Sequence, residues 1–299
     1  MRGIVVALPN DSDLAAAIGK GGAESSMNFY NRKVEDDTIT VLTPSDLEKK
    51  YYAVPESILL ADTILLSTAR VDALLGETLI AAGMTGKPVV LTDENDVSRL
   101  AQDAGAGRIS VVGRAGALDE LRRIGCGESA NDTRVDIDAA FNVKGVGAVL
   151  LGIVRSGTIK VHDTMVHSSG KRISIRSIQS LDVDIDSAVK GIRVGLAVKG
   201  LESSDFEKGD VLADRAIPRV KGAKVKLRLG KIYSEGSTGG DIIGFSSGFS
   251  HCQARISGLN EGSCTVSFEK AIPLDAGDQF LLSQESKPRI FGFGTVIGV

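Results

Sequence analysis

The chain has 299 residues, a length that predicts two or three domains. Hydrophobic residues make up 42% and charged residues 24%, which is typical of a globular protein and excludes a mainly disordered chain. The net charge of −3 conceals an asymmetry: residues 1–133 hold 13 basic and 20 acidic side chains, whereas residues 134–299 hold 22 and 18. An evenly basic nucleic-acid-binding protein is therefore excluded, but a basic face in the second part is not.

Targeting and redox signals are weak. No apolar run reaches the roughly 20 residues that cross a bilayer, and the first residues lack the pattern of a signal peptide. The three cysteines, Cys126, Cys252 and Cys264, have no spacing typical of a disulfide framework or a zinc site. We therefore expect a cytoplasmic protein with reduced thiols and no metal site.

The first part of the chain alternates apolar strands with helical segments. Strands are predicted at Gly3–Leu8, Thr38–Leu42, Thr63–Thr68, Pro88–Thr92 and Arg108–Val112. Helices are predicted at Leu14–Ile18, Leu47–Leu60, Ala73–Ala82, Val97–Ala104 and Ala117–Ile124. Pro55 is expected to kink or break the second helix. Fully apolar strands between helices predict a parallel sheet that is covered on both faces.

From about Thr133 the apolar residues recur at every second position, between many glycines. One set of strands is predicted at Val135–Val143, Val146–Val154, Arg172–Ser180, Val194–Lys199 and Val211–Ala213. After Pro218 a second set is predicted at Lys221–Lys231, Ile242–Phe249, Cys252–Ile256, Cys264–Phe268, Gln279–Leu282 and Ile290–Ile297. Each set is typical of an antiparallel barrel or sandwich. The predicted domains are residues 1–133, 134–217 and 218–299.

A resemblance to the second domain of the translational GTPases is carried by residues 141–165, FNVKGVGAVLLGIVRSGTIKVHDTM. That family has an aromatic residue, Gly-x-Gly between two strands, and then Gly-x-[Ile/Leu]-[Lys/Arg]-x-x-Asp. Residues 176–214 continue the match in order, and residues 248–299 resemble the family's third domain. The selenocysteine-specific elongation factors are the most similar branch, and elongation factor Tu is more distant. The resemblance implies a degenerate P-loop-GTPase-like α/β domain followed by two antiparallel β-barrels.

The first domain lacks the nucleotide-binding motifs of that family. The phosphate loop would follow Leu8, but residues 9–13 contain neither glycine nor lysine and are acidic. Residues 42–45, LTPS, stand where the family has Asp-x-x-Gly, and residues 92–95, TDEN, stand where it has Asn-Lys-x-Asp. The glycine-rich stretch at 18–26 fits a helix end and loop better than a phosphate site. We expect no catalytic or nucleotide-binding residues and no GTP or Mg²⁺.

The three histidines suggest no catalytic centre. His162, His167 and His251 have no metal-ligand spacing, and His251 and Cys252 are adjacent on a predicted strand, so they point to opposite faces. We expect no Ser-His-Asp set from the sequence.

Two predicted strands carry basic stripes, because their cations alternate with apolar residues and so share one face. The stripes consist of Lys224, Lys226 and Arg228 and, more weakly, of Lys171, Arg172 and Arg176. Each stripe can follow the phosphates of RNA, or can simply form the solvated side of a half-buried strand.

The resemblance also implies a tRNA site, because the family's second domain holds the acceptor end of tRNA and its aminoacyl group. It carries this role to Asp138, Phe141, Gly145, Gly147, Gln179 and Gly195. Val146, Leu151 and Asp182 stand where elongation factor Tu has arginine, threonine and arginine, so not every acceptor-end contact can exist.

The resulting hypothesis is a protein similar to a translation elongation factor, without GTP hydrolysis, that binds tRNA or another RNA through its barrels. One alternative is a pseudo-GTPase scaffold whose acidic first domain docks on the ribosome or a translation factor. The other is an atypical GTP-binding elongation factor. Neither DNA nor a membrane is an expected partner.

Overall fold

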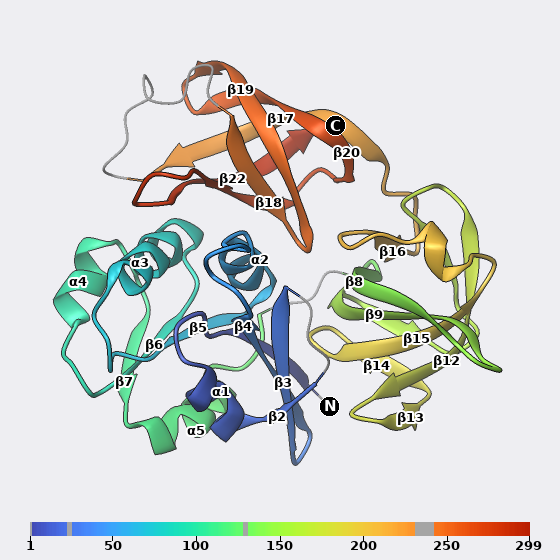
Figure 1. The fold of residues 1–299 in the computed structure, drawn as a ribbon, viewed down its shortest axis with the longest axis horizontal. Helices are drawn as coiled ribbons and strands as arrows, with labels where there is room; N and C mark the ends of the chain where they lie inside the picture. The colour runs from blue at the N-terminus through green and yellow to red at the C-terminus, as the bar shows by residue number, and fades with distance from the viewer. Residues whose placement is uncertain (1, 23–25, 128–130, 231–241) are drawn as a thin grey trace.

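The computed structural model describes residues 2–22, 26–127, 131–230 and 242–299. They form an α/β domain and two β-barrels, and Figure 1 shows each of the three parts lying against the other two. None of the helices in the described ranges is long and apolar enough to cross a membrane.

The α/β domain is built on a seven-stranded sheet with the order β2-β3-β4-β1-β5-β6-β7. Its strands are β1 (Arg2–Ala7), β2 (Lys20–Gly21), β3 (Met27–Val34), β4 (Asp37–Pro44), β5 (Thr63–Leu66), β6 (Val89–Thr92) and β7 (Ile109–Val112). Its helices are α1 (Ser12–Ile18), α2 (Ala53–Leu60), α3 (Ala73–Thr85), α4 (Ser98–Asp103) and α5 (Ala117–Ile124). Apolar residues of α1 and α5 cover one face of the sheet, and those of α2, α3 and α4 cover the other.

Two features of this domain differ from the prediction. The sheet is mixed, because β3 runs antiparallel to β4 and β2 antiparallel to β3. The sequence concealed β3 because polar residues such as Asn31 and Arg32 interrupt its apolar pattern after Phe29. Helix α2 begins only at Ala53, so Pro55 lies in its first turn, where a missing N–H costs no helical hydrogen bond and causes no break.

The first barrel closes through the order β11-β16-β8-β9-β15-β12, with β12 also pairing with β11. Its strands are β8 (Arg134–Val143), β9 (Gly147–Ser156), β11 (Thr164–His167), β12 (Arg172–Ser180), β15 (Arg193–Lys199) and β16 (Val211–Ala213). The strands β10 (Thr158–Lys160) and β14 (Ser187–Val189) pair with each other, and β13 (Val183–Ile185) extends the sheet beyond β12. The prediction missed β10, β11, β13 and β14, because three or four residues are too few to show a period.

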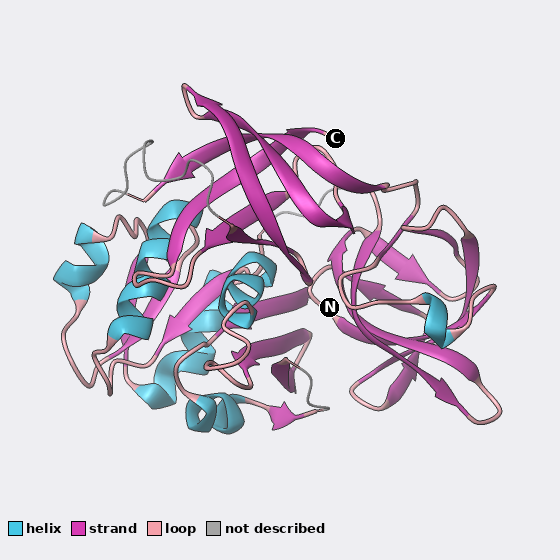
Figure 2. Ribbon diagram, turned by 45° about the horizontal axis from the view of Figure 1, so that its top comes forward, coloured by secondary structure: helices cyan, strands magenta, loops and turns pink. Residues whose placement is uncertain are grey.

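The second barrel closes through the order β17-β20-β19-β18-β21-β22. Its strands are β17 (Arg219–Leu229), β18 (Ile243–Ser247), β19 (Ser250–Asn260), β20 (Ser263–Pro273), β21 (Gln279–Ser283) and β22 (Ile290–Gly298). Lys231, the predicted end of the first of these strands, lies outside the described residues. Figure 2 shows that the helices gather in the α/β domain, whereas the barrels are almost entirely strand.

The three parts are packed together rather than tethered. The apolar core under α2 and α3 continues into the second barrel through Phe249, Leu281 and Ile290. Between β1 and the turn before β15 the backbones touch: a Cβ built on Gly191 would lie 2.4 Å from the carbonyl oxygen of Gly3. Such a short distance leaves no room for any side chain at either glycine.

Candidate functional site

The carboxyl edge of the α/β sheet is where an open sheet of this kind usually binds ligands. Here a network of side chains spans that edge. Arg114, after β7, donates to Asp11 at 2.7 Å and to Glu94 at 3.1 Å. Asn10 donates its side-chain amide to the carbonyl of Ser67 at 2.7 Å. The loops after β1, β5, β6 and β7 are therefore bound to one another by the chain's own polar groups.

The N-terminus of α1 is also bound by a side chain of the protein itself. The carboxylate of Asp11 accepts a hydrogen bond from the amide of Leu14 at 2.7 Å and so caps the helix. Burial raises the pKa of Asp11, but hydrogen bonds from Arg114 and Leu14 outweigh it, and the net pKa lies below the ordinary value. An ionised carboxylate thus lies where a phosphate loop would present amides and a lysine to phosphate.

Residues 92–95, which stand in place of Asn-Lys-x-Asp, also form hydrogen bonds within the protein. Thr92 accepts a hydrogen bond from the amide of Thr68 at 2.7 Å, and the side chain of Asn95 donates to the carbonyl of Thr68 at 2.7 Å. Glu94 accepts from the Thr68 hydroxyl at 3.2 Å. These side chains hold the loop after β5 instead of facing an open base site.

Helix α2 is held at both ends. In its first turn Glu56 is fully buried, and the ammonium of Lys208, from the first barrel, lies 2.6 Å from its carboxylate. Burial raises the pKa of Glu56 to about 7, against the opposing effect of Lys208. At the other end Arg155, also from the first barrel, donates to the carbonyl of Leu60 at 3.1 Å. The helix after β4 is thereby fixed to the first barrel.

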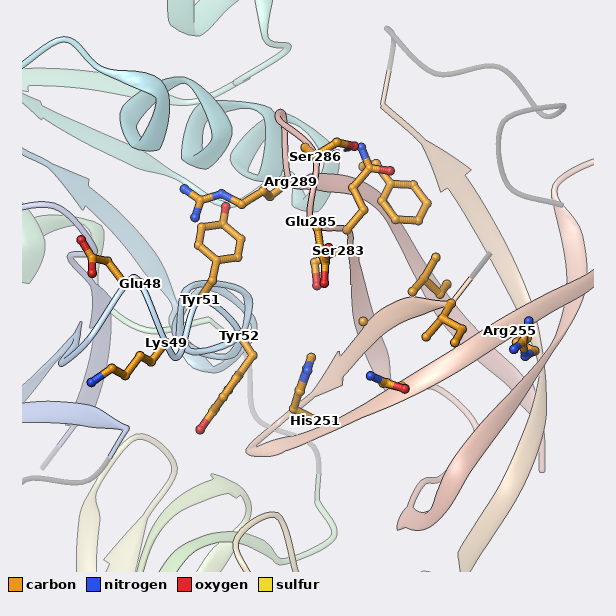
Figure 3. A pocket seen from close by; sticks show the side chains of 16 residues that line it. Glu48, Lys49, Tyr51, Tyr52, His251, Arg255, Ser283, Glu285, Ser286 and Arg289 are labelled. Atoms are coloured by element: carbon orange, nitrogen blue, oxygen red, sulfur yellow. Dashed lines mark hydrogen bonds between the residues drawn. The ribbon is translucent and has the colours of Figure 1, made fainter. Parts of the chain in front are cut away.

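A groove of about 1290 Å³ separates the segment before α2 from the second barrel. Figure 3 shows Tyr52 and His251 side by side in its lining, and their rings stack with centroids 4.8 Å apart, so the two segments are in contact at this point. Burial, more than the nearby Lys208 and Lys270, lowers the pKa of His251 to about 4, so this imidazole is neutral at pH 7. Cys252, the next residue, is buried in the core of the second barrel, as the expected alternation of the strand requires.

On another side of this groove, an ion pair between Arg289 and Glu77 joins the second barrel to α3. Arg289 lies 3.0 Å from the buried carboxylate of Glu77, and its guanidinium lies 3.5 Å from the centre of the Tyr51 ring. Figure 3 shows Arg289 above Tyr51 at the rim. The Tyr51 hydroxyl also donates to Glu77, at 2.8 Å. The groove is thus closed at one side by a stacked and charged interdomain contact.

Most of the candidate RNA-binding residues of the first barrel lie on the outer face of its strands. Phe141 is 42% exposed, and Lys171, Arg172, Arg176 and Gln179 are exposed as well. Arg176 donates to the carbonyl of Val146 at 3.1 Å and so reaches the β8–β9 turn from β12. Gly195 lies opposite Gln179 on β12 and opposite Leu151 on β9. We call this surface, with Phe141, Arg172, Arg176, Gln179 and Gly195, the first-barrel face.

Two glycines at the edge of this face are required by the backbone. Gly145 and Gly147, in the β8–β9 turn, have φ angles of 82° and 97°. Residues with a Cβ rarely adopt this region, so their presence is explained by the turn alone. A contact with RNA at these two positions stays a prediction.

Asp138 lies elsewhere. It is 4% exposed, and its carboxylate accepts a hydrogen bond from Arg193 at 2.9 Å. The guanidinium of Arg193 in turn lies 3.3 Å from the centre of the Phe29 ring, in the α/β domain. The position therefore serves a buried contact between the first barrel and the α/β domain, and it is not part of the first-barrel face.

The second basic stripe has the predicted alternation. Lys224, Lys226 and Arg228 on β17 are exposed, whereas Val225 and Leu227 between them point into the second barrel. They belong to a different barrel from Lys171, Arg172 and Arg176, so the chain carries two separate stripes and not one continuous surface strip.

Among the residues that the structure describes, His167 belongs to a Ser-His-Asp set that the sequence did not reveal. The ring of buried His167 lies 2.8 Å from the hydroxyl of exposed Ser169 and 3.0 Å from the carboxylate of Asp210. The amide of Ser169 also donates to this ring, and the amide of Gly170 to the carbonyl of His167, so the turn offers no free amide pair for an oxyanion. The set ties β11 to the segment before β16.

Comparison with known proteins points to one group. Residues 147–213 match elongation factor Tu domain 2. An uncharacterized protein of Methanocaldococcus jannaschii is 27% identical, over 98% of this chain and 99% of its own length. The selenocysteine-specific elongation factor of the same organism is 27% identical over 55% of this chain and 41% of its own length. Elongation factor 1-alpha of Cenarchaeum symbiosum is 38% identical over 28% and 20%.

Solved structures share the whole fold. Translation elongation factor SelB from Methanococcus maripaludis, in complex with the GTP analogue GppNHp, has a TM-score of 0.78 at 17% identity, covering 99% of this chain and 79% of that chain. A bacterial selenocysteine-specific elongation factor has a TM-score of 0.79 at 19% identity, covering 99% and 58%. The predicted architecture, an α/β domain followed by two antiparallel barrels, is confirmed.

Proposed function

Because the chain belongs to the translational GTPase family, we propose that it is an elongation-factor-like protein that binds RNA through its barrels and no longer binds or hydrolyses GTP. In this proposal the α/β domain is a structural support. It needs neither GTP nor Mg²⁺, and the protein works with the translation machinery of the cytoplasm, on tRNA or on the RNA of the ribosome.

The loss of the nucleotide is supported above all by the network around Arg114. Nucleotide binding would require Arg114 to leave Asp11 and Glu94, and it would bring phosphates toward two carboxylates. No lysine or glycine of the segment after β1 could compensate, since residues 9–13 contain neither.

RNA binding is supported by the chemistry of the barrels. The first-barrel face combines an exposed aromatic ring with arginines, the combination on which proteins stack and hold unpaired nucleotides. The stripe on β17 adds three cations without an acidic partner among the described residues.

Nucleotide binding is tested by titrating fluorescent GTP and GDP analogues with Mg²⁺ into the protein. We expect no saturable signal up to millimolar nucleotide. Micromolar affinity would instead favour the atypical GTP-binding factor, and D11N/E94Q, which removes the two carboxylates and keeps Arg114, is then the variant expected to bind more tightly.

RNA binding is tested by measuring affinity for aminoacylated and deacylated total tRNA over a salt series. We expect log affinity to fall linearly with log salt, and R172Q/R176Q to weaken binding at least tenfold. A control, R70Q/R99Q, removes two exposed arginines of the α/β domain and should leave binding unchanged. Absence of binding even at low salt would overturn the RNA proposal and favour a scaffold that docks through the acidic α/β domain.

A further inference from the structure

The hairpin that joins β12 to β13 presents an unusual surface. Its residues 181–186 read Leu-Asp-Val-Asp-Ile-Asp, and β13 is the last strand of its sheet, paired with β12 alone. Figure 1 shows β13 at the lower margin of the first barrel. We call these six residues the acidic hairpin.

Apolar side chains of the acidic hairpin are left in solvent. Val183 is 60% exposed and Leu181 39%, while Ile185 is half-buried. Leu181 and Asp182 form the turn with φ angles of 53° and 61°, where an Asn-Gly pair would be the ordinary choice. A leucine there has unfavourable backbone geometry and still keeps 39% of its surface exposed.

The charge around these apolar groups has one sign. Asp182, Asp184 and Asp186 are exposed and have no lysine or arginine partner among the described residues. Asp184 instead accepts a hydrogen bond from Gln179 at 2.9 Å, at the border of the first-barrel face. Three carboxylates repel both a nucleic acid backbone and an anionic membrane, and they attract a cationic surface.

We propose that the acidic hairpin is a docking surface for a basic protein segment, which covers Leu181 and Val183 with apolar side chains and pairs its lysines or arginines with the three aspartates. The two surfaces of the first barrel then take different partners: RNA binds the cationic first-barrel face, and a protein binds the acidic hairpin beside it. The proposal does not depend on RNA binding.

The probe for this site is a labelled 12-residue peptide of alternating lysine and leucine, compared with a lysine–serine peptide of equal charge and a glutamate–leucine peptide. We expect the lysine–leucine peptide to bind at least tenfold more tightly than either comparator. NMR amide shifts on binding should be confined to residues 179–186. Shifts spread over other acidic parts of the protein would overturn the proposal, because they would indicate attraction to net charge alone.

Two variants separate the apolar from the charged contribution. L181S/V183S and D182N/D184N/D186N are each expected to weaken peptide binding at least tenfold without changing the melting temperature. L181S/V183S should leave tRNA affinity unchanged, whereas D182N/D184N/D186N should raise it, because it removes carboxylates that repel phosphate. The control V71S/I297S removes two other exposed apolar residues, 57% and 55% exposed, and should bind the peptide normally. Unchanged peptide binding in both hairpin variants would refute the site, and a loss of tRNA affinity would assign the hairpin to RNA instead.

Discussion

The ammonium group of Lys208, in the first barrel, lies 2.6 Å from the carboxylate of Glu56, on helix α2 of the α/β domain, and Glu56 has no exposed surface. The same lysine lies 2.6 Å from the hydroxyl of Ser26, at the start of β3. One side chain of the barrel therefore holds two elements of the neighbouring domain. Because buried charges are stable only when paired, this contact makes the two domains depend on each other.

The first prediction concerns this pair. K208M leaves the Glu56 carboxylate buried without a partner, which should lower the free energy of unfolding by about 3–5 kcal/mol. Since E56Q removes the unpaired charge, the double variant E56Q/K208M should be more stable than K208M. The measurement is urea unfolding of the wild type, both single variants and the double variant. Strictly additive losses would show that the two residues are not coupled.

The second prediction concerns the backbone contact between domains. G191A places a Cβ 2.4 Å from the carbonyl oxygen of Gly3, so the α/β domain and the first barrel must separate or unfold. Small-angle X-ray scattering should show an expanded particle, and the melting temperature should fall. The control is G258A: Gly258 also has a positive φ, of 67°, but no atom lies within 4 Å of its Cβ position, so it should cost only about 1 kcal/mol. Equal effects of the two variants would mean that the contact is unimportant.

The third prediction is a pH dependence carried by His251. Its pKa is about 4 in the folded protein and near 6.5 in the unfolded chain, so the unfolded state binds the proton more readily. This group should therefore lower stability as the pH falls from about 6.5 to 4, by roughly 3 kcal/mol, and contribute no pH dependence above that window. H251Q should flatten this part of the curve when urea unfolding is measured from pH 4 to 8. Parallel curves for the wild type and H251Q would contradict the prediction.

The fourth prediction separates the two basic stripes. If Lys224, Lys226 and Arg228 each contact a phosphate, K224Q/K226Q/R228Q should lower the slope of log affinity against log salt by about 2–3. An unchanged slope, measured with the same tRNA series, would assign this stripe to the solvated side of β17. RNA would then contact the first barrel without it.

Much of the fold follows from local patterns in the chain. The apolar run around Val90 and the helix at Ala117–Ile124 were predicted at nearly their observed positions. Burial on both faces leaves a continuous apolar run, and burial of one helical face leaves a period of 3.6 residues. Strand β3 was missed, since only Met27 and Phe29 of its eight residues are buried and the polar Asn31 and Arg32 interrupt the apolar pattern. The strands β10 and β13 were missed because three residues each are too few to show an alternating pattern.

The candidate surfaces were predicted unevenly. The alternation of Lys224, Lys226 and Arg228 with buried residues holds, because a two-residue period needs only the strand itself. Asp138 could not be assigned from the sequence: its partner Arg193 is 55 residues away, and the ring of Phe29 that completes the contact belongs to another domain. Asp210 could not be paired with His167 for the same reason, because only the closing of the first barrel brings it to the turn of His167 and Ser169.

The sequence by itself determined that residues 9–13 contain neither the glycines nor the lysine of a phosphate loop, because such a loop is a contiguous motif that can be read directly from the chain. Only the tertiary structure decided which side chains come together at that edge of the sheet and between the domains. Asp11, Glu94 and Arg114 come from three separate loops, and Glu56 and Lys208 from two domains. Long-range ion pairs have no local period or motif in a chain, since the free energy that selects them arises only when folding removes both charges from water.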